Sequence, residues 1–424
     1  MRSPRLFSLL LASLLLLSLL GCGKEQGGGG AGRVTPPPTQ ETESVSTPTP
    51  TPTPTPPADP YDAVRTYWSA DQLTQAWGPE KPVEHIFFHP VIAYPKWAFF
   101  DGPATKSEKL GLDDWMVTVD EYNAILDSLY ARNYILVAME DVWSEVTDET
   151  GTHMVRNTLM LPEGKKPLII SFDDVNYYPY MLEQGFTSKL VLGEDGQIWA
   201  ECTDPYTGET FLTQELDATP ILDNFVLAHP DFSLNGAKAI YSLTGYCGIL
   251  GYRTHTDRNT PQSELAAFEA NRQKEREAVK PIIQRLKETG WTFGSHTWGH
   301  INLANKGLST VQTDTRKWMD EVGTLVGPTN ILFYPHGARP DGDDWKTTGP
   351  IFRYLHDQGF RVFASVGINS FSYIKKDISA VICDRLHPDG TTLRWNRDRY
   401  AQFYDAWEII DLENRPSLPY DRAP

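Results

Sequence analysis

Cysteine is scarce in this chain. Four cysteines among 424 residues are too few for a scaffold held together by disulfides. Three of them, Cys202, Cys247 and Cys383, lie in the part with globular character, and their spacing matches no zinc-binding module. We expect them to be small buried side chains, and their odd number allows at most one disulfide among them.

Basic residues are also in the minority. The 38 Lys and Arg residues face 55 Asp and Glu residues, which gives a formal net charge of −17. A nucleic-acid-binding protein needs a basic face to neutralise phosphates, so this balance argues against that class. The 40% of hydrophobic residues and 12% of aromatic residues are enough for a core, which excludes a chain that is disordered throughout.

Long apolar runs are limited to one, residues 6–20, which is as long as the apolar part of an export signal and short for a membrane span. It follows Arg2 and Arg5 and ends in Gly21-Cys22, which resembles a bacterial lipobox. We therefore expect residues 1–22 to be a lipoprotein signal peptide. The mature protein would be anchored outside the cytoplasm, on the bacterial cell membrane, by a lipid on Cys22. The alternative is an ordinary signal peptide with an incidental cysteine.

The next segment, residues 23–60, has no apolar periodicity. It contains four consecutive glycines at 27–30 and Thr-Pro repeats at 47–57. Gly-rich chains are flexible and Pro-rich chains are extended, so this composition is typical of a tether. The sequence thus predicts a tether over 23–60 and a folded domain over 61–424.

In the folded part, short apolar runs alternate with amphipathic stretches. The predicted strands are 83–88, 134–139, 166–172, 186–192, 237–243, 292–295, 331–334, 361–365 and 379–383, and the predicted helices are 118–132, 212–228, 262–289, 310–326 and 347–358. Such alternation predicts an α/β fold with a mainly parallel sheet. The number of units suits a (β/α) barrel, possessing some irregularity.

Two adjacent carboxylates, Asp173 and Asp174, end the very apolar strand 166–172. Active sites of barrels lie at the carboxyl ends of the strands, so this is where catalytic carboxylates belong. Neighbouring carboxylates repel each other unless a cation lies close to them. The alternative is a polar strand end that caps the next helix.

Two histidines, His296 and His300, follow the strand 292–295 in the segment SHTWGH. Their spacing allows both rings to face one metal ion from a single turn of the backbone. One Asp and two His would form a three-residue set that leaves metal positions open for water and substrate. The alternative is a pair of surface histidines on a loop.

The SFDD segment and the later SHTWGH segment together resemble the polysaccharide deacetylases, carbohydrate esterase family 4. In that family the first Asp is the catalytic base, and the second Asp and both His hold the metal. The resemblance implies that Asp173 is the base and that Asp174, His296 and His300 bind one divalent ion, for which Zn²⁺ suits the ligand types. It also implies an irregular (β/α) barrel of the polysaccharide deacetylase type.

A third segment, residues 331–337 (ILFYPHG), resembles the Pro-Tyr-Gly turn that walls the substrate groove of the family. The resemblance implies that Tyr334, Pro335 and Gly337 bind substrate.

The general acid has two candidates. The common form of the family has its acid histidine near the C-terminus, where this chain has His387. A circularly permuted group, which includes the biofilm poly-N-acetylglucosamine deacetylases, has it after the first strand, and residues 83–91 (VEHIFFHPV) resemble that segment. We prefer His89, which predicts that loss of His387 has little effect.

The chain is unusually long between Asp174 and His296, which are about 120 residues apart. The extra length lies mainly in residues 193–258, which predicts a large insertion or lid between the Asp-Asp strand and the His-x-x-x-His strand. The family also uses an arginine to orient the base, and Arg253, Arg339 and Arg385 are all candidates for that role.

These features predict a metal-dependent hydrolase that removes acetyl groups, N-acetyl foremost, from an extracellular or cell-wall polysaccharide. It would cleave non-peptide C–N bonds, with the acetylated polysaccharide and, through Cys22, the membrane as partners. One alternative is a non-catalytic surface carbohydrate-binding protein on the same barrel, which Val175 in place of the glycine usual after the Asp pair would suit. A phosphoesterase is a weaker alternative, because the site lacks the extra carboxylates of a two-metal centre.

Overall fold

The computed structural model describes residues 59–342 and 347–416. The predicted signal peptide, the Cys22 that we expect to carry a lipid, and the predicted tether up to residue 58 lie outside the described residues. Within the described part, no helix has the length and apolar character that crossing a bilayer requires.

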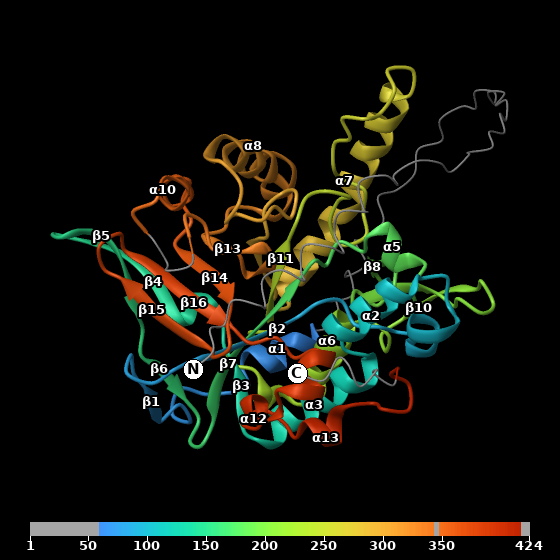
Figure 1. The fold of residues 1–424 in the computed structure, drawn as a ribbon. Coiled ribbons are helices and arrows are strands. Elements are labelled where there is room, and N and C mark those ends of the chain that lie inside the picture. Colours follow the sequence, from blue (N-terminus) through green and yellow to red (C-terminus); the bar gives the residue numbers. More distant parts are fainter. Residues whose placement is uncertain (1–58, 343–346, 417–424) are drawn as a thin grey trace, which may run out of the picture.

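The centre of the molecule is a twisted sheet that curls into a nearly closed barrel (Figure 1). Its parallel strands, in spatial order, are β2 (Glu84–Phe88), β7 (Lys166–Asp173), β11 (Ala239–Leu243), β12 (Thr292–Ser295), β13 (Ile331–Phe333), β14 (Val362–Val366) and β16 (Ala380–Arg385). The two ends of this order meet, because Leu386, just after β16, forms a parallel bridge with Ile86 of β2. Leu386 N–H donates to the carbonyl of His85 at 3.0 Å, and Phe87 N–H donates to the carbonyl of Leu386 at 2.9 Å. The predicted irregular barrel is confirmed.

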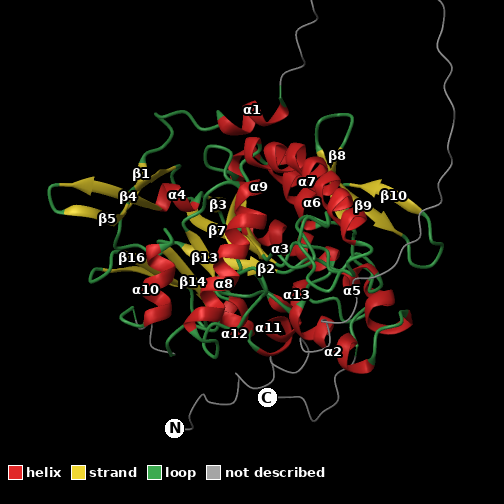
Figure 2. Cartoon of the chain, turned by 90° about the horizontal axis from the view of Figure 1, so that it is seen from above, coloured by secondary structure: helices red, strands yellow, loops and turns green. Residues whose placement is uncertain are grey.

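Helices surround the sheet, as the view from above shows (Figure 2). They are α1 (Pro60–Arg65), α2 (Lys106–Trp115), α3 (Val119–Ala131), α4 (Met139–Val142), α5 (Pro179–Leu182), α6 (Ala218–Ala228), α7 (Leu265–Glu288), α8 (Leu308–Trp318), α9 (Thr324–Val326), α10 (Pro350–Asp357), α11 (Gly390–Trp395), α12 (Arg397–Tyr400) and α13 (Ala406–Ile409). The start of α3 is fixed by a reciprocal cap, in which Thr118 Oγ1 accepts from Glu121 N–H and the Glu121 carboxylate accepts from Thr118 N–H.

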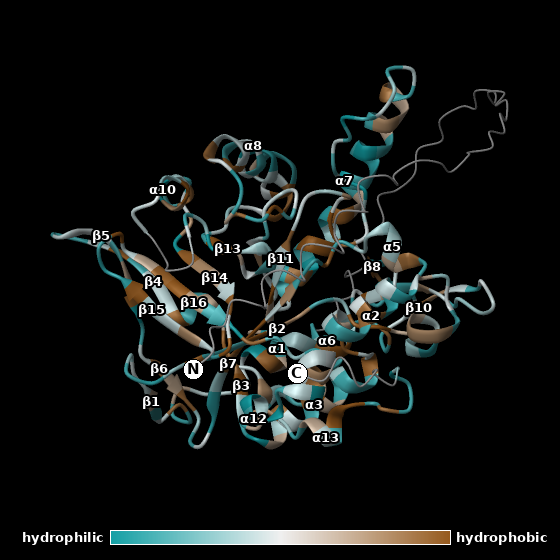
Figure 3. Ribbon diagram, in the orientation of Figure 1, coloured by the Kyte–Doolittle hydropathy of each residue, from teal (hydrophilic) through white to brown (hydrophobic). Residues whose placement is uncertain are grey.

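The strands are buried on both faces, which explains their continuous apolar sequences. One set of alternate residues packs against the helices; it includes Ile170 and Tyr241, which lie in the cluster formed with α3, α6 and α7. The intervening residues, such as Ile169, Ile240 and Phe333, form a second cluster. Figure 3 shows hydrophobic residues concentrated along these central strands.

Smaller strands lie around the barrel. β15 (Phe371–Lys375) pairs with β16, β3 (Tyr134–Leu136) pairs in parallel with the start of β7, β1 (Gln75–Trp77) pairs with β6 (Leu159–Leu161), and β4 (Trp143–Asp148) forms a hairpin with β5 (Gly151–Arg156). The apolar pattern did not predict β1, β4, β5, β6 or β15, because each of these strands has at most two buried side chains.

The long segment between the two motifs is not a single insertion. Residues 193–258 include β11, which is a barrel strand between β7 and β12. The additional structure consists of a three-stranded sheet of β8 (Lys189–Leu192), β9 (Ile198–Thr203) and β10 (Thr210–Thr213), and of the loop that follows β11. Cys202 in β9 and Cys383 in β16 are buried thiols, as expected, whereas Cys247, in the loop after β11, is only partly buried.

The helix predicted over 212–228 begins six residues later than expected. Residues up to Thr213 belong to β10, and α6 starts at Ala218. Asp217 determines this start, because its side chain accepts from Thr219 N–H at 2.9 Å and caps the helix.

Candidate active site

The two carboxylates lie where β7 ends. Asp173 is the last residue of the strand and Asp174 follows it with φ 62°. A residue other than glycine is strained in this left-handed region, although Asp tolerates it better than most. The chain after β7 therefore has its first positive φ at Asp174 itself and a second at Tyr177. Val175, where the family usually has glycine, is left as an ordinary buried residue.

Arg385, at the end of β16, binds Asp173 with both terminal nitrogens. Its Nη1 is 2.8 Å from Asp173 Oδ1 and its Nη2 is 2.9 Å from Oδ2, and both side chains are buried. Burial opposes ionisation of Asp173, but Arg385 and then His296 outweigh it and hold the pKa of Asp173 below its ordinary value. Asp173 is thus kept as an oriented carboxylate.

The other two candidate arginines have different contacts. Arg253 donates to the carbonyl of Cys247 and to that of Tyr177, each at 2.7 Å, and so ties the loop after β11 to the loop after β7. Arg339 pairs with Asp384 at 2.6 Å. Only the tertiary structure separates these three residues.

His296 follows β12 directly, and its ring has a defined tautomer. Its Nδ1 is 3.0 Å from the carbonyl oxygen of Phe333, which can only accept, so Nδ1 carries the hydrogen. Its Nε2 lies 3.8 Å from Asp173 Oδ2. With the hydrogen on Nδ1, a neutral ring presents the Nε2 lone pair, which is the form in which an imidazole binds a metal ion.

The loop from His296 to His300 is held by Asp314 of α8. The Asp314 carboxylate accepts from Trp298 N–H at 2.7 Å and from Gly299 N–H at 2.8 Å. Burial raises the pKa of Asp314 to about 6, although the two N–H donors act in the opposite direction.

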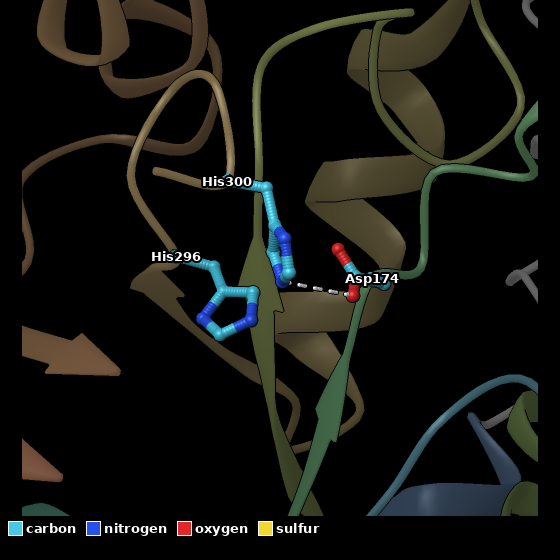
Figure 4. A group of neighbouring side chains, drawn as sticks. All are labelled: Asp174, His296 and His300. Carbon is cyan, nitrogen blue, oxygen red and sulfur yellow. Dashed lines mark ion pairs between the residues drawn. The ribbon is translucent and has the colours of Figure 1, made fainter. Parts of the chain in front are cut away.

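Asp174, His296 and His300 converge on one point (Figure 4). One ligand atom from each lies within 4.8 Å of the others, and Asp174 Oδ2 is 3.5 Å from His300 Nε2. Burial, followed by His296, lowers the pKa of His300 well below its ordinary value, which keeps the ring in the neutral form that binds metals. The donor set of two imidazoles and one carboxylate fits a divalent ion such as zinc.

Tyr178 orients one of these ligands. Its hydroxyl donates to Asp174 Oδ1 at 2.6 Å and lies 2.6 Å from Thr244 Oγ1. This bond occupies Oδ1 and leaves Oδ2 facing His300. A supporting bond of this kind typically fixes a ligand carboxylate.

A cavity of about 340 Å³ opens beside these residues. Asp173 lines it, together with the cluster of Asp174, His296 and His300. Aromatic side chains and the turn after β13 complete the lining: Phe87, Trp115, Tyr178, Tyr180, Tyr246, Tyr334, His336 and Gly337. Tyr334 and Gly337, predicted to bind substrate, reach the cavity, although Tyr334 is fully buried. Pro335 is buried and is not among the lining residues.

Both candidate acids line this cavity. His89 follows β2 and His387 follows Leu386, so the closure of the barrel brings them together. His89 Nδ1 is 3.0 Å from His387 Nε2, and His387 Nδ1 is 3.0 Å from Asp389 Oδ2. The sequence presented these two histidines as alternatives, whereas the structure makes them a pair.

Residues 260–346 match the family model described as polysaccharide deacetylase. Over this segment the match agrees with the predicted resemblance to polysaccharide deacetylases, whereas the circularly permuted grouping stays a prediction. The matched segment contains His296, His300 and the Pro-His-Gly turn, whereas the Asp pair lies before it. No curated protein matches the chain.

Two solved structures are similar to this chain. One is the Streptococcus pyogenes deacetylase PplD in complex with acetate, with 13% identity, coverage of 73% of this chain and 94% of that chain, and a TM-score of 0.39. The other is IcaB from Ammonifex degensii, with 12% identity, coverage of 76% and 97%, and a TM-score of 0.38.

Sequence reasoning missed several residues of the candidate site. Tyr178, His336 and Asp389 all contact predicted site residues, and His336 has its ring centroid 4.4 Å from that of His300. Tyr178 lies four positions after Asp174 and His336 lies within the quoted turn, so proximity in sequence was the available signal. For Asp389 the signal was its position two residues after His387.

Proposed function

We propose that this protein is a metal-dependent deacetylase that removes acetyl groups, N-acetyl foremost, from an extracellular or cell-wall polysaccharide. The observation that carries the proposal is the position of Asp173. Both of its carboxylate oxygens accept hydrogen bonds from Arg385. It lies beside the cluster of Asp174, His296 and His300 at one rim of the barrel. The family match supports deacetylation, and the donor set supports the metal.

Asp174, His296 and His300 would hold the ion. A divalent metal bound there, zinc by ligand type, would polarise the acetyl carbonyl and make a water molecule acidic near neutral pH. Asp174 is oriented for this by Tyr178, and His296 by the carbonyl of Phe333. Within residues 59–342 and 347–416 this is a single cluster without a second set of carboxylates, which suits acyl transfer better than a two-metal reaction.

Asp173 is proposed to accept the proton of the attacking water. It remains a carboxylate because of Arg385, and both of its oxygens are held in place. A general base must be within hydrogen-bond reach of the proton that it removes, and a position between Asp173 and the cluster satisfies this requirement.

The oxyanion would be stabilised by a backbone N–H of the turn after β13. Within Tyr334–Gly337, the N–H of Tyr334 donates to Ala364 and that of Gly337 donates to Tyr334, while Pro335 has none. The N–H of His336 is therefore the donor that we assign to this role. His89 would protonate the leaving amine.

The shape and lining of the cavity support a carbohydrate substrate. Tyr178, Tyr180 and Tyr246 form a stack, with ring centroids 5.8 Å and 4.8 Å from that of Tyr178. Aromatic faces combined with nearby polar groups suit a sugar ring, which has apolar C–H surfaces and hydroxyl edges.

Acetate release tests the proposal. Purified protein lacking the first 58 residues would be freed of metal, reconstituted with zinc, and incubated with acetylated chitooligosaccharide or peptidoglycan. We expect acetate release that depends on the metal and is lost in Asp173→Asn. Zinc-loaded protein that binds these glycans but releases no acetate would instead support the non-catalytic alternative.

The lipid anchor on Cys22 and the location outside the cytoplasm are part of the proposal and rest on the sequence alone. Such an anchor would place the domain beside cell-envelope glycans, with the tether providing reach.

A further inference from the structure

We propose that His387 and Asp389 act through His89: together the three side chains form a hydrogen-bonded relay that orients His89 and returns a proton to it as the amine departs. This inference rests on the proposed function. It replaces the expectation that His387 is dispensable, and it assigns both candidate histidines to one device.

The Asp389 carboxylate determines which nitrogens of the relay donate hydrogen bonds. The Asp389 carboxylate can only accept, so His387 Nδ1, at 3.0 Å, carries a hydrogen. His387 Nε2 then faces His89 Nδ1 at 3.0 Å, and one hydrogen lies between these two nitrogens. With Nδ1 engaged, Nε2 is the nitrogen of His89 that is left for a substrate in the cavity.

His387 is built into the fold more firmly than a dispensable residue requires. Its N–H donates to Tyr400 Oη at 3.1 Å, and its carbonyl accepts from Tyr400 Oη at 2.9 Å and from Thr392 Oγ1 at 3.0 Å. Its ring is parallel to that of Phe87, with centroids 4.3 Å apart, and to that of Trp115 at 6.5 Å. Aromatic faces stabilise a positively charged imidazole.

The relay provides a place for a proton that His89 alone would not hold. Burial, followed by His387, lowers the pKa of His89 to about 3. His89 in this environment is therefore neutral at pH 7. We assign the additional proton of the pair to His387, because the Asp389 carboxylate lies 3.0 Å from its Nδ1 and offsets the charge.

One proton passes through the relay to the leaving amine. Before the step, His387 carries hydrogens on Nδ1 and Nε2, and His89 carries one on Nε2. As the C–N bond breaks, its electron pair remains on nitrogen and takes the Nε2 proton of His89. The Nε2 proton of His387 moves to His89 Nδ1, so both rings end neutral, and solvent restores the lost proton.

Asp389→Asn separates the charge of Asp389 from its structural role. Asp389 Oδ1 also caps α11 by accepting from Thr392 N–H at 2.7 Å, and Asn caps helices as well as Asp does. The variant should keep its fold and its metal content. The matched control is Asp148→Asn, which alters a surface His-Asp pair, with 3.6 Å between His153 Nε2 and Asp148 Oδ2, on the β4–β5 hairpin.

The zinc-loaded wild type, Asp389→Asn, His89→Gln, the double variant and the control are assayed on acetylated chitooligosaccharide and on an activated aryl acetate. On the glycan we expect His89→Gln to lose roughly 10²–10⁴-fold in kcat and Asp389→Asn at least about 10-fold. On the aryl acetate, whose leaving group needs no proton, each should lose less than about threefold. The double variant should lose no more than His89→Gln, because Asp389 acts through His89.

Nitrogen NMR of the histidine rings gives a second measurement that does not depend on turnover. We expect the His89 ring ¹⁵N shifts to change in zinc-loaded Asp389→Asn and to stay unchanged in Asp148→Asn. Full glycan activity in Asp389→Asn, equal losses on the two substrates, or unchanged His89 shifts would overturn the relay. A wild type inactive on both substrates would overturn the proposed function, and the NMR result would still decide the relay.

Discussion

Arg385 and Asp173 form a buried, two-pronged ion pair that joins the last parallel strand of the barrel to the strand carrying the acidic pair. The guanidinium also lies over the rings of Phe87 and Phe333, with centroids at 4.1 Å and 4.5 Å, and its Nη1 lies 3.0 Å from Ser171 Oγ. The Arg385 guanidinium therefore links β16, β2 and β13 to the proposed base on β7. Its loss should affect both folding and activity.

Arg385→Met should lower the free energy of unfolding by about 3–5 kcal/mol, because Asp173 would become a buried charge without its partner. Arg385→Lys retains the positive charge but cannot donate two parallel hydrogen bonds to Asp173. It should be more stable than Arg385→Met and still lose activity. Urea unfolding and acetate release are the measurements. Lys280→Met, in an exposed pair with Glu277, is the control and should change stability by less than about 1 kcal/mol. Equal effects of Arg385→Met and the control would contradict the buried-pair argument.

Asp174→Ala and His296→Ala should lose bound zinc and activity together, because two remaining ligands hold the ion poorly. Asp173→Asn should lose activity while keeping its zinc, since Asp173 is not in the ligand set. Metal analysis after gel filtration, with acetate release in parallel, separates these outcomes. Full zinc occupancy in either ligand variant would refute the assignment.

Tyr178→Phe should weaken zinc affinity by roughly 10- to 100-fold, because the hydroxyl that orients Asp174 is removed without a change in the ring. Competition with a chelator measures this affinity. Tyr180→Phe is the matched control, since it removes a hydroxyl from the same aromatic stack. An equal affinity in Tyr178→Phe and Tyr180→Phe would show that the bond to Asp174 does not support the ion.

Asp314 should make the protein less stable as the pH rises from about 4 to 6. Its pKa in the folded state is about 6 against 3.8 for the ordinary group, so the folded state binds the proton more tightly. Its contribution is full below pH 4 and is lost as the pH passes through 6, by at most about 3 kcal/mol. Denaturant unfolding at several pH values should show this decline, and Asp314→Asn should flatten it. A variant with the same decline would assign it to other groups.

Cys22→Ser should release the protein from the membrane fraction and leave the folded domain unchanged, because the variant lacks the thiol that carries the lipid. Cell fractionation with an immunoblot measures this distribution, and Cys202→Ser, in the folded domain, is the control. Variant protein that stays in the membrane fraction would show that residues 6–20 are retained as an anchor.

The sequence by itself determined the parallel strands that carry the site and the chemistry at their ends. Apolar runs predicted β2, β7, β11 and β12 to within a few residues, because strands buried on both faces contain little else. The carboxylates after β7 and the histidines after β12 could be brought together from the sequence, since parallel strands end at one rim. These signals are local in the sequence, and the family resemblance combined them into one predicted site.

Only the tertiary structure decided which distant residues meet. The sequence did not distinguish Arg253, Arg339 and Arg385. In the structure, the barrel closes at the bridge between Ile86 and Leu386, and Arg385, next to Leu386, is the arginine that binds Asp173. The same closure paired His89 with His387, which are 298 residues apart. No periodicity predicts such contacts, because they depend on how the first and last strands of the barrel align, and that alignment is determined by the packing of the whole sheet.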